Sequence, residues 1–292
     1  MKDYLVKTLA DKGQFRVYAV DATNTVAEAQ KRHDTWSSST EALGRSLIAT
    51  MLLSTSMMKN DEILTTRLMG NGPVKGIIVD GDAKGNVKGY IQEPHINLPL
   101  TKDGKVNTAK AVGNQGILAV TKDQGMKQPF TGKVPLISGT IAEDYAYYLT
   151  KSEQIPSAIG LSVVLDKNDK VIHAGGFMVQ TLPNAKNDAI DNLIKNIKKM
   201  PSLDDLLSKG DKPEEIIDQI FSTGEAKLLQ TMPVAFKCDC SKERFSHSLA
   251  TLSKKELQSM IDQNNGAELT CQFCGDKYEF SKDDLEKIIA SK

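Results

Sequence analysis

The sequence predicts an α+β protein with a sheet-and-helix core, a helical linker and a small C-terminal domain. Strand-like and helix-like runs alternate irregularly up to Pro183, which is typical of an α+β core. Beyond Pro183, apolar residues recur at helical spacing between Pro and Gly breakers. All four cysteines lie within the last 55 residues. We therefore place the three parts at 1–182, 183–230 and 231–292.

The strands of the core are predicted from short apolar runs bounded by turn residues. They cover residues 14–20, 73–79, 86–91, 115–120, 159–165 and 171–179. Residues 80–85 have the composition of a hairpin turn, so the second and third of these strands should pair. Gly175 and Gly176 in the last strand indicate a bulge.

Two helices are predicted within the core. Residues 41–58 are rich in Ala, Leu and Met, and Thr40 is the expected N-cap. A shorter helix over 141–149 follows the Ser-Gly-Thr sequence at 138–140. Its first turn carries Glu143 and Asp144, which the helix dipole favours there without any catalytic role.

The linker is predicted as short amphipathic helices. Its apolar stripes are Ile190, Leu193, Ile194, Ile197, Leu203, Leu206, Leu207, Ile216, Ile217, Ile220 and Phe221. Helix-breaking residues at Pro201, Gly210, Pro213 and Gly224 divide the linker into separate short helices. The stripes must cover another surface. Two readings stay open: ordinary packing on the core, or a docked segment whose release exposes apolar surface.

The C-terminal part is predicted to hold two helices and a strand. Residues 249–261 contain one helix, with Ser253 and Glu256 at the spacing of a capping box. Residues 278–280 are strand-like. Ser281 is the expected N-cap of a last helix through Ile289, with acidic residues at 283 and 284 in its first turn.

The four cysteines form two close pairs separated by thirty residues, Cys238-Asp239-Cys240 and Cys271-Gln272-Phe273-Cys274. Two such pairs present four thiolates to one tetrahedral ion, and four soft sulfurs select zinc over magnesium or calcium. The same atoms could pair as disulfides instead. The basic residues Lys237, Lys242, Arg244 and Lys277 are expected to stabilise thiolates, or simply to lie on a solvated face.

Composition limits the setting and the partners. The 37 basic and 37 acidic residues balance, and residues 231–292 hold nine basic against ten acidic, so no basic surface for nucleic acid or an anionic membrane is predicted. The N-terminus lacks the apolar segment of a secretory signal, and the apolar stretch 47–58 is too short and polar for a bilayer. We expect a cytoplasmic protein, a compartment where thiols are kept reduced.

Other familiar chemistry is not predicted. The sequence has no phosphate-binding G-x-x-x-x-G-K-[ST] motif, so no nucleotide is expected. Residues 80–91 begin like a calcium loop but end in Ile91 instead of Glu. The four histidines, His33, His95, His173 and His247, show no ligand spacing among themselves.

Several motifs together resemble one protein family. The run Phe-Lys-Cys-Asp-Cys-Ser-Lys-Glu-Arg at 236–244, with the second cysteine pair and Tyr-Glu-Phe at 278–280, is similar to the C-terminus of the redox-regulated 33 kDa chaperonins. Ser-Gly-Thr-Ile-Ala-Glu-Asp at 138–144 and Ser-Glu-Gln-Ile-Pro-Ser-Ala at 152–158 resemble their core domain. Ala-Gly-Gly-Phe at 174–177 and Gln-Thr-Leu-Pro at 180–183 resemble its end. The resemblance covers essentially the whole chain.

The resemblance implies an ATP-independent holdase with no enzymatic activity. In the reduced, inactive state, Cys238, Cys240, Cys271 and Cys274 would hold one Zn²⁺ per chain. Oxidants would form Cys238–Cys240 and Cys271–Cys274 disulfides and release zinc. The linker would then unfold, and the active homodimer would bind unfolded client proteins. Two other classes stay open: a zinc-ribbon nucleic-acid module, which would need a basic face, and a thiol oxidoreductase, which would need one attacking cysteine.

Overall fold

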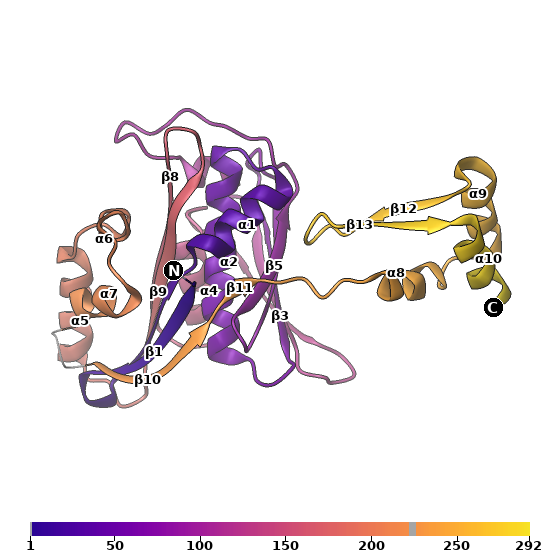
Figure 1. The fold of residues 1–292 in the computed structure, drawn as a ribbon. Coiled ribbons are helices and arrows are strands. Elements are labelled where there is room, and N and C mark those ends of the chain that lie inside the picture. The colour runs from indigo at the N-terminus through magenta and orange to yellow at the C-terminus, as the bar shows by residue number, and fades with distance from the viewer. Residues whose placement is uncertain (1, 222–225) are drawn as a thin grey trace. The chain divides into compact units, whose positions relative to one another are not determined.

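Two sheets form the framework of the chain up to Lys237 (Figure 1). The computed structural model describes residues 2–221 and 226–292. One sheet is antiparallel, has five strands and runs in the order β10-β1-β2-β9-β8. Its strands are β1 (Tyr4–Ala10), β2 (Phe15–Asp21), β8 (Ser157–Leu165), β9 (Val171–Thr181) and β10 (Ala226–Pro233).

The other sheet has six strands in the order β11-β5-β4-β3-β6-β7. Its strands are β3 (Ile63–Met69), β4 (Gly76–Asp82), β5 (Asn86–Ile91), β6 (Ile117–Asp123), β7 (Phe130–Pro135) and β11 (Ala235–Phe236). All its pairings are antiparallel except that of β11 with β5. β10 and β11 follow one another in the chain, so a single segment lines the edge of both sheets.

Helix α2 (Ser37–Met57) lies between the two sheets and is buried on nearly every side (Figure 1). Such all-round burial fits its run of Ala, Leu, Ile and Met. The other helical pieces of this region are α1 (Thr23–His33), α3 (Thr108–Val112), α4 (Ala142–Lys151) and a 3-10 turn at Asp11–Gly13. Within 2–221 and 226–292 no helix has both the length and the apolar character needed to cross a bilayer.

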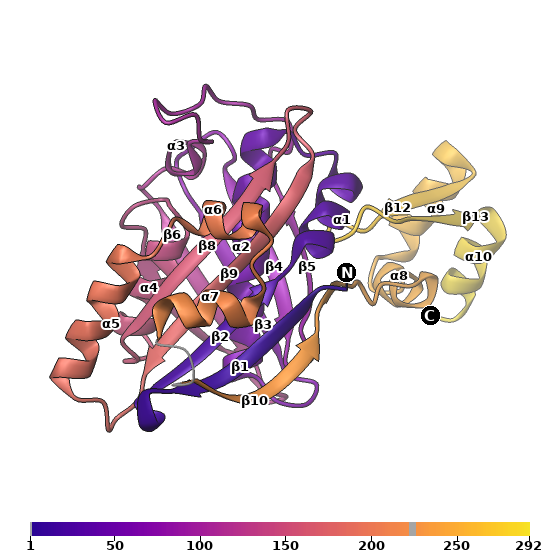
Figure 2. The ribbon, with the colours of Figure 1, turned by 60° about the vertical axis from the view of Figure 1, so that its left-hand side comes forward.

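The predicted linker helices lie on the five-stranded sheet (Figure 2). They are α5 (Asn187–Lys199), α6 (Leu203–Lys209) and α7 (Pro213–Ile220). Their apolar side chains form one buried cluster with Val6, Phe15, Val17, Ala19, Phe177 and Val179 of the sheet. This confirms that the stripes cover a surface, with Ile194, 45% exposed, as an exception. The predicted breaker Gly224 lies outside the described residues.

Cys238–Lys292 forms a second compact unit with its own small core. It contains α8 (Lys242–Leu249), α9 (Lys254–Asn264), the hairpin of β12 (Gly266–Thr270) and β13 (Lys277–Ser281), and α10 (Lys282–Ala290). Its buried apolar side chains are Leu249, Leu257, Ile261, Phe280, Leu285 and Ile288. Both predicted caps are confirmed: Ser253 caps α9 in a capping box with Glu256, and Ser281 caps α10.

The α+β class is confirmed, but some predicted details are wrong. β9 keeps a regular register through Gly175 and Gly176, so the predicted bulge is not found there. α2 begins at Ser37, and its N-cap is Trp36, not Thr40. The segment 93–98 satisfies the hydroxyls of the serines that precede Thr40. Ser38 Oγ accepts from Leu98 N at 2.9 Å and Ser39 Oγ donates to the Glu93 carbonyl at 2.7 Å. This tertiary contact adds a buried turn to the helix.

Candidate metal centre

The first cysteine pair follows a segment that is fixed to the six-stranded sheet. Lys237 N donates to the Val87 carbonyl at 2.8 Å, directly after the pairing of β11 with β5. The Phe236 ring lies 6.4 Å from the His33 ring and 5.8 Å from the guanidinium carbon of Arg32, both measured to its centroid. The chain is therefore anchored up to the residue directly before Cys238.

Cys240, the second residue of the first pair, lies next to the N-terminus of helix α8. Ser241 caps α8, because its Oγ accepts from Arg244 N at 3.3 Å. Helix α8 begins at Lys242, so Cys240 is separated from it only by this capping residue. The chain around Cys240 is therefore ordered by local hydrogen bonds as well as by any ligand it holds.

The second cysteine pair lies in the turn between β12 and β13. Cys271 N donates to the Asp276 carbonyl at 2.8 Å, and Gly275 N donates to the Cys271 carbonyl at 2.7 Å. Gly275 has φ +78°, a left-handed conformation that glycine adopts without steric cost. This tight turn brings the Cys271 and Cys274 sulfurs to one side, which is the geometry of a zinc knuckle.

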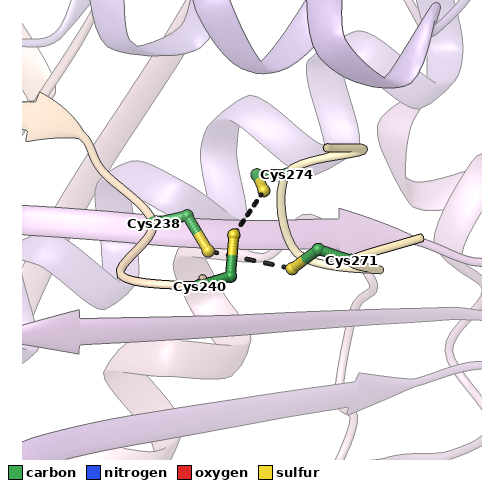
Figure 3. A group of neighbouring side chains, drawn as sticks. All are labelled: Cys238, Cys240, Cys271 and Cys274. Carbon is green, nitrogen blue, oxygen red and sulfur yellow. Dashed lines mark hydrogen bonds between the residues drawn. The ribbon is translucent and has the colours of Figure 1, made fainter. Parts of the chain in front are cut away.

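The fold brings all four sulfurs together, as the sequence predicts (Figure 3). Every Sγ lies within 4.8 Å of the others. The Sγ atoms of Cys238 and Cys271 are 3.8 Å apart, and those of Cys240 and Cys274 are 3.3 Å apart. A Zn–S bond of about 2.3 Å places the sulfurs of a tetrahedral site about 3.8 Å apart. The donor set and its spacing therefore fit a tetrahedral metal ion.

Ionisation of all four thiols of the cluster would require a cation at its centre. Burial raises the pKa of the Cys238 thiol to about 11. Burial, followed by the neighbouring thiols, raises the pKa of Cys274. Burial also opposes ionisation of Cys240, but hydrogen bonds from Tyr278 and from the other thiols outweigh it and lower its pKa. Four thiolates at this separation need compensating positive charge, which a metal ion supplies.

The nearby basic residues do not supply that charge. Lys242 pairs with Asp284 at 2.9 Å, Lys277 pairs with Glu268 at 2.9 Å, and Arg244 pairs with Asp239. These three side chains are between 48% and 63% exposed. The prediction that they stabilise thiolates is therefore not supported, and the solvated-face reading describes them.

The other candidate groups form no second cluster of metal ligands among the described residues. Among residues 2–221 and 226–292, the four cysteines are the one cluster of three or more potential metal ligands. His33 packs on Phe236, and His95 packs on Trp36 and contacts Asp34 at 3.2 Å. The calcium-like segment is the β4–β5 hairpin, in which Asp82 accepts hydrogen bonds within the turn.

One residue of the site was missed by sequence reasoning. The Tyr278 hydroxyl lies 3.2 Å from Cys240 Sγ and 3.1 Å from the Cys240 carbonyl oxygen. The sequence predicted only a strand there. No local signal could have revealed this contact, because it joins residues 38 positions apart through the fold of the hairpin.

Comparisons with known proteins agree with this architecture. The family model described as Hsp33 protein matches residues 3–281. Proteins named 33 kDa chaperonin from Levilactobacillus brevis and Lactiplantibacillus plantarum are 57% and 53% identical, over 99% of this chain and 98% of each relative. The crystal structure of the 33 kDa chaperonin from Thermotoga maritima superposes with a TM-score of 0.92 at 35% identity, over 100% of this chain and 99% of that one. This chain therefore belongs to the Hsp33 family of chaperones.

Proposed function

We propose that this chaperone is a redox-regulated, ATP-independent holdase that binds unfolding or oxidatively damaged proteins and prevents their aggregation. It is inactive while Cys238, Cys240, Cys271 and Cys274 are reduced and hold one Zn²⁺. Oxidation of these thiols releases zinc and activates the protein. The protein acts in the cytoplasm, has no enzymatic activity, and needs no nucleotide, nucleic acid or membrane.

The observation that carries this proposal is the position of the chain's only four thiols. They lie within 4.8 Å of one another in the small unit that starts at Cys238. A chain of about 60 residues buries only about 60% of its unfolded surface and is marginally stable alone. Structural zinc supplies roughly 10–16 kcal/mol of apparent binding free energy, so loss of the ligands removes most of what orders such a unit.

Oxidation is proposed to pair neighbouring cysteines, Cys238 with Cys240 and Cys271 with Cys274. All four sulfurs are close enough for this pairing after small movements. The resulting loops are very short, and short disulfide loops restrict an unfolded chain least. The disulfides would therefore not replace the stabilisation that zinc provides.

The docked helices α5–α7 are proposed to be the regulated element. Segment 226–237 joins them to the metal unit and lies at the edges of both sheets. Most side chains of β10 are exposed, so the strand is held mainly by its ladder with β1. Loosening of this segment and of α5–α7 would uncover Phe15, Val17 and Phe177 together with the apolar faces of the helices. Unfolded clients would bind this surface, and the active form would be a homodimer.

Light scattering by a thermally unfolding client tests the proposal. Oxidised protein should suppress aggregation without ATP, and a dithiol reductant should reverse this. A variant with all four cysteines changed to Ser, treated with the same oxidant, controls for oxidation of methionine. Equal suppression by the reduced, zinc-loaded wild-type protein would rule out redox gating. Catalytic turnover of a disulfide substrate with excess reductant would instead indicate a thiol oxidoreductase.

A further inference from the structure

Tyr278 contacts the first cysteine pair from the opposite half of the metal unit. Its hydroxyl oxygen lies 3.2 Å from Cys240 Sγ and 3.1 Å from the Cys240 carbonyl oxygen. Both acceptors belong to one residue, so the phenol proton can be directed to either of them. The cysteines themselves form the metal site, whereas this hydroxyl acts on one of their sulfurs from outside the ligand set.

The phenol ring is held in this position by two elements. Tyr278 pairs with Leu269 across the β12–β13 hairpin. Its ring also packs on the Phe245 ring of α8, with the centroids 5.0 Å apart and the planes tilted by 35°. The hairpin carries the second cysteine pair and α8 follows the first. The position of the hydroxyl is therefore set by elements on both sides of the site.

The charge on sulfur determines which acceptor takes the proton. A neutral thiol is a weak acceptor, so the carbonyl oxygen is then the better partner. A thiolate is charged, and hydrogen bonds to charged acceptors are about twice as strong as neutral ones. In the reduced, metal-competent state, where Cys240 is a thiolate, Tyr278 therefore donates to its sulfur.

We propose that Tyr278 is a positioning residue that slows oxidation of Cys240 by donating this hydrogen bond. The inference rests on the proposed redox function and deepens it. In the first step, the Cys240 thiolate attacks hydrogen peroxide, the O–O bond breaks, and the products are a sulfenic acid and hydroxide. A second thiolate then displaces hydroxide to form the disulfide, so two sulfurs lose two electrons and the peroxide gains them. A hydrogen bond from Tyr278 withdraws electron density from the Cys240 sulfur, and a hydrogen-bonded thiolate is a poorer nucleophile.

The variant Tyr278→Phe isolates the hydroxyl, because it keeps the ring and its contact with Phe245. Zinc release from the reduced full-length protein, followed with a chromogenic chelator under excess hydrogen peroxide, should be roughly 3- to 10-fold faster than in wild type, which corresponds to the loss of about one hydrogen bond. The matched control is Phe245→Leu, which removes the ring contact but leaves Tyr278 held near Cys240 by its pairing with Leu269 across the hairpin. It should accelerate release much less.

A spectroscopic measurement separates the hydrogen bond from a general loosening of the site. In the Co²⁺-loaded protein, the thiolate-to-metal charge-transfer band should move to lower energy in Tyr278→Phe and stay in place in Phe245→Leu. Site-specific 3-fluorotyrosine at position 278, a stronger donor, should slow zinc release below the wild-type rate. This third arm keeps the test valid if Tyr278→Phe binds metal poorly.

Three results would overturn the inference. These are an unmoved charge-transfer band in Tyr278→Phe, an unchanged rate of zinc release, or equal acceleration by Phe245→Leu. The fully oxidised Tyr278→Phe variant should protect a client as well as oxidised wild type does. If neither oxidised protein protects a client, the holdase proposal fails while the rate and the spectrum still decide the role of Tyr278.

Discussion

Each of the four cysteines contributes one sulfur to the cluster, so loss of two should abolish the proposed metal binding. The double variant Cys238→Ser/Cys271→Ser removes one ligand from each pair, and a hydroxyl replaces a thiolate poorly. We expect its zinc content to fall from one per chain to near zero, measured by elemental analysis of the reduced protein. The unit from Cys238 to Lys292 should then lose ordered structure, because about 10–16 kcal/mol of apparent binding free energy disappears.

The control for this variant is Asp239→Asn, a change between two ligands that leaves every sulfur in place. It should keep one zinc per chain, since Asp239 pairs with Arg244 and offers no ligand atom to the cluster. Stoichiometric zinc in the double cysteine variant would mean that the four sulfurs are not the ligand set.

Residue-level sequence reasoning succeeded where chemistry is encoded in local spacing. The two cysteine pairs could be recognised because the sulfurs within each pair are neighbours in the chain. The contact of Tyr278 with Cys240 could not be recognised, since it depends on how the hairpin packs against Cys240. The proposed role of the basic residues in stabilising thiolates could not be judged from local sequence for a related reason. The carboxylate partner of Lys242 is Asp284, which lies 42 positions away.

Helix α6 is docked on the core by a partly buried polar contact in addition to its leucines. Ser162 Oγ donates to Asp204 at 2.7 Å, and Lys105 Nζ donates to its other carboxylate oxygen at 2.6 Å. Burial alone would raise the pKa of Asp204, but these hydrogen bonds outweigh it and hold the pKa below its ordinary value of 3.8. The carboxylate therefore contributes to docking only while it is ionised.

Neutralising Asp204 should loosen α6 in the reduced protein. We expect Asp204→Asn to lower the free energy of local opening by about 1–2 kcal/mol, allowing for partial exposure of the ion pair. Hydrogen exchange of the α6 amides measures this directly. The control is Asp218→Asn, the same chemical change at an exposed position of α7. Equal exchange in the two variants would show that the contact does not hold the helix.

The same contact predicts a pH dependence of α6 docking. A carboxyl group whose pKa is lowered on folding stabilises the folded state above its unfolded pKa and loses that contribution as the pH falls through the folded value. Docking should therefore be constant from neutral pH down to about pH 5 and weaken progressively below the ordinary value of 3.8. In Asp204→Asn this acid-dependent part of α6 exchange should be absent.

Strands and helices were predicted well where their signal lies in adjacent residues. Strand β5 was predicted with the bounds that it has, because its alternation and the preceding turn are both encoded in adjacent residues. β1 and β10 were not predicted. Their pairing joins residues more than 200 positions apart, and the exposed, mixed side chains of β10 carry no strand alternation. Such long-range pairing stabilises a strand that local propensity does not specify.

On the scale of the molecule, the sequence anticipated a change of character at Pro183, whereas the packing changes at Cys238. Helices α5–α7 share a core with the five-stranded sheet and so belong to the same compact unit as residues before Pro183. Composition cannot reveal this, because an amphipathic helix has the same pattern whether it docks permanently or reversibly. Whether 183–230 acts as a separate regulatory part stays a prediction about stability.

Hydrogen exchange in the two redox states tests that prediction over the whole chain. On oxidation, residues 238–292 should lose protection first, because their core has only six buried apolar side chains and the proposed metal would supply most of its stability. Helices α5–α7 should lose protection next, while α2 and the central strands β2, β9, β3 and β4, which lie inside the sheets, keep theirs.

Removal of zinc from reduced protein by a chelator is the matched control, since it withdraws the metal without forming disulfides. If zinc removal alone loosens 238–292 and α5–α7, loss of the metal is the trigger and the disulfides only make it persist. Unchanged protection of α5–α7 under both treatments would mean that these helices are a permanent part of the core.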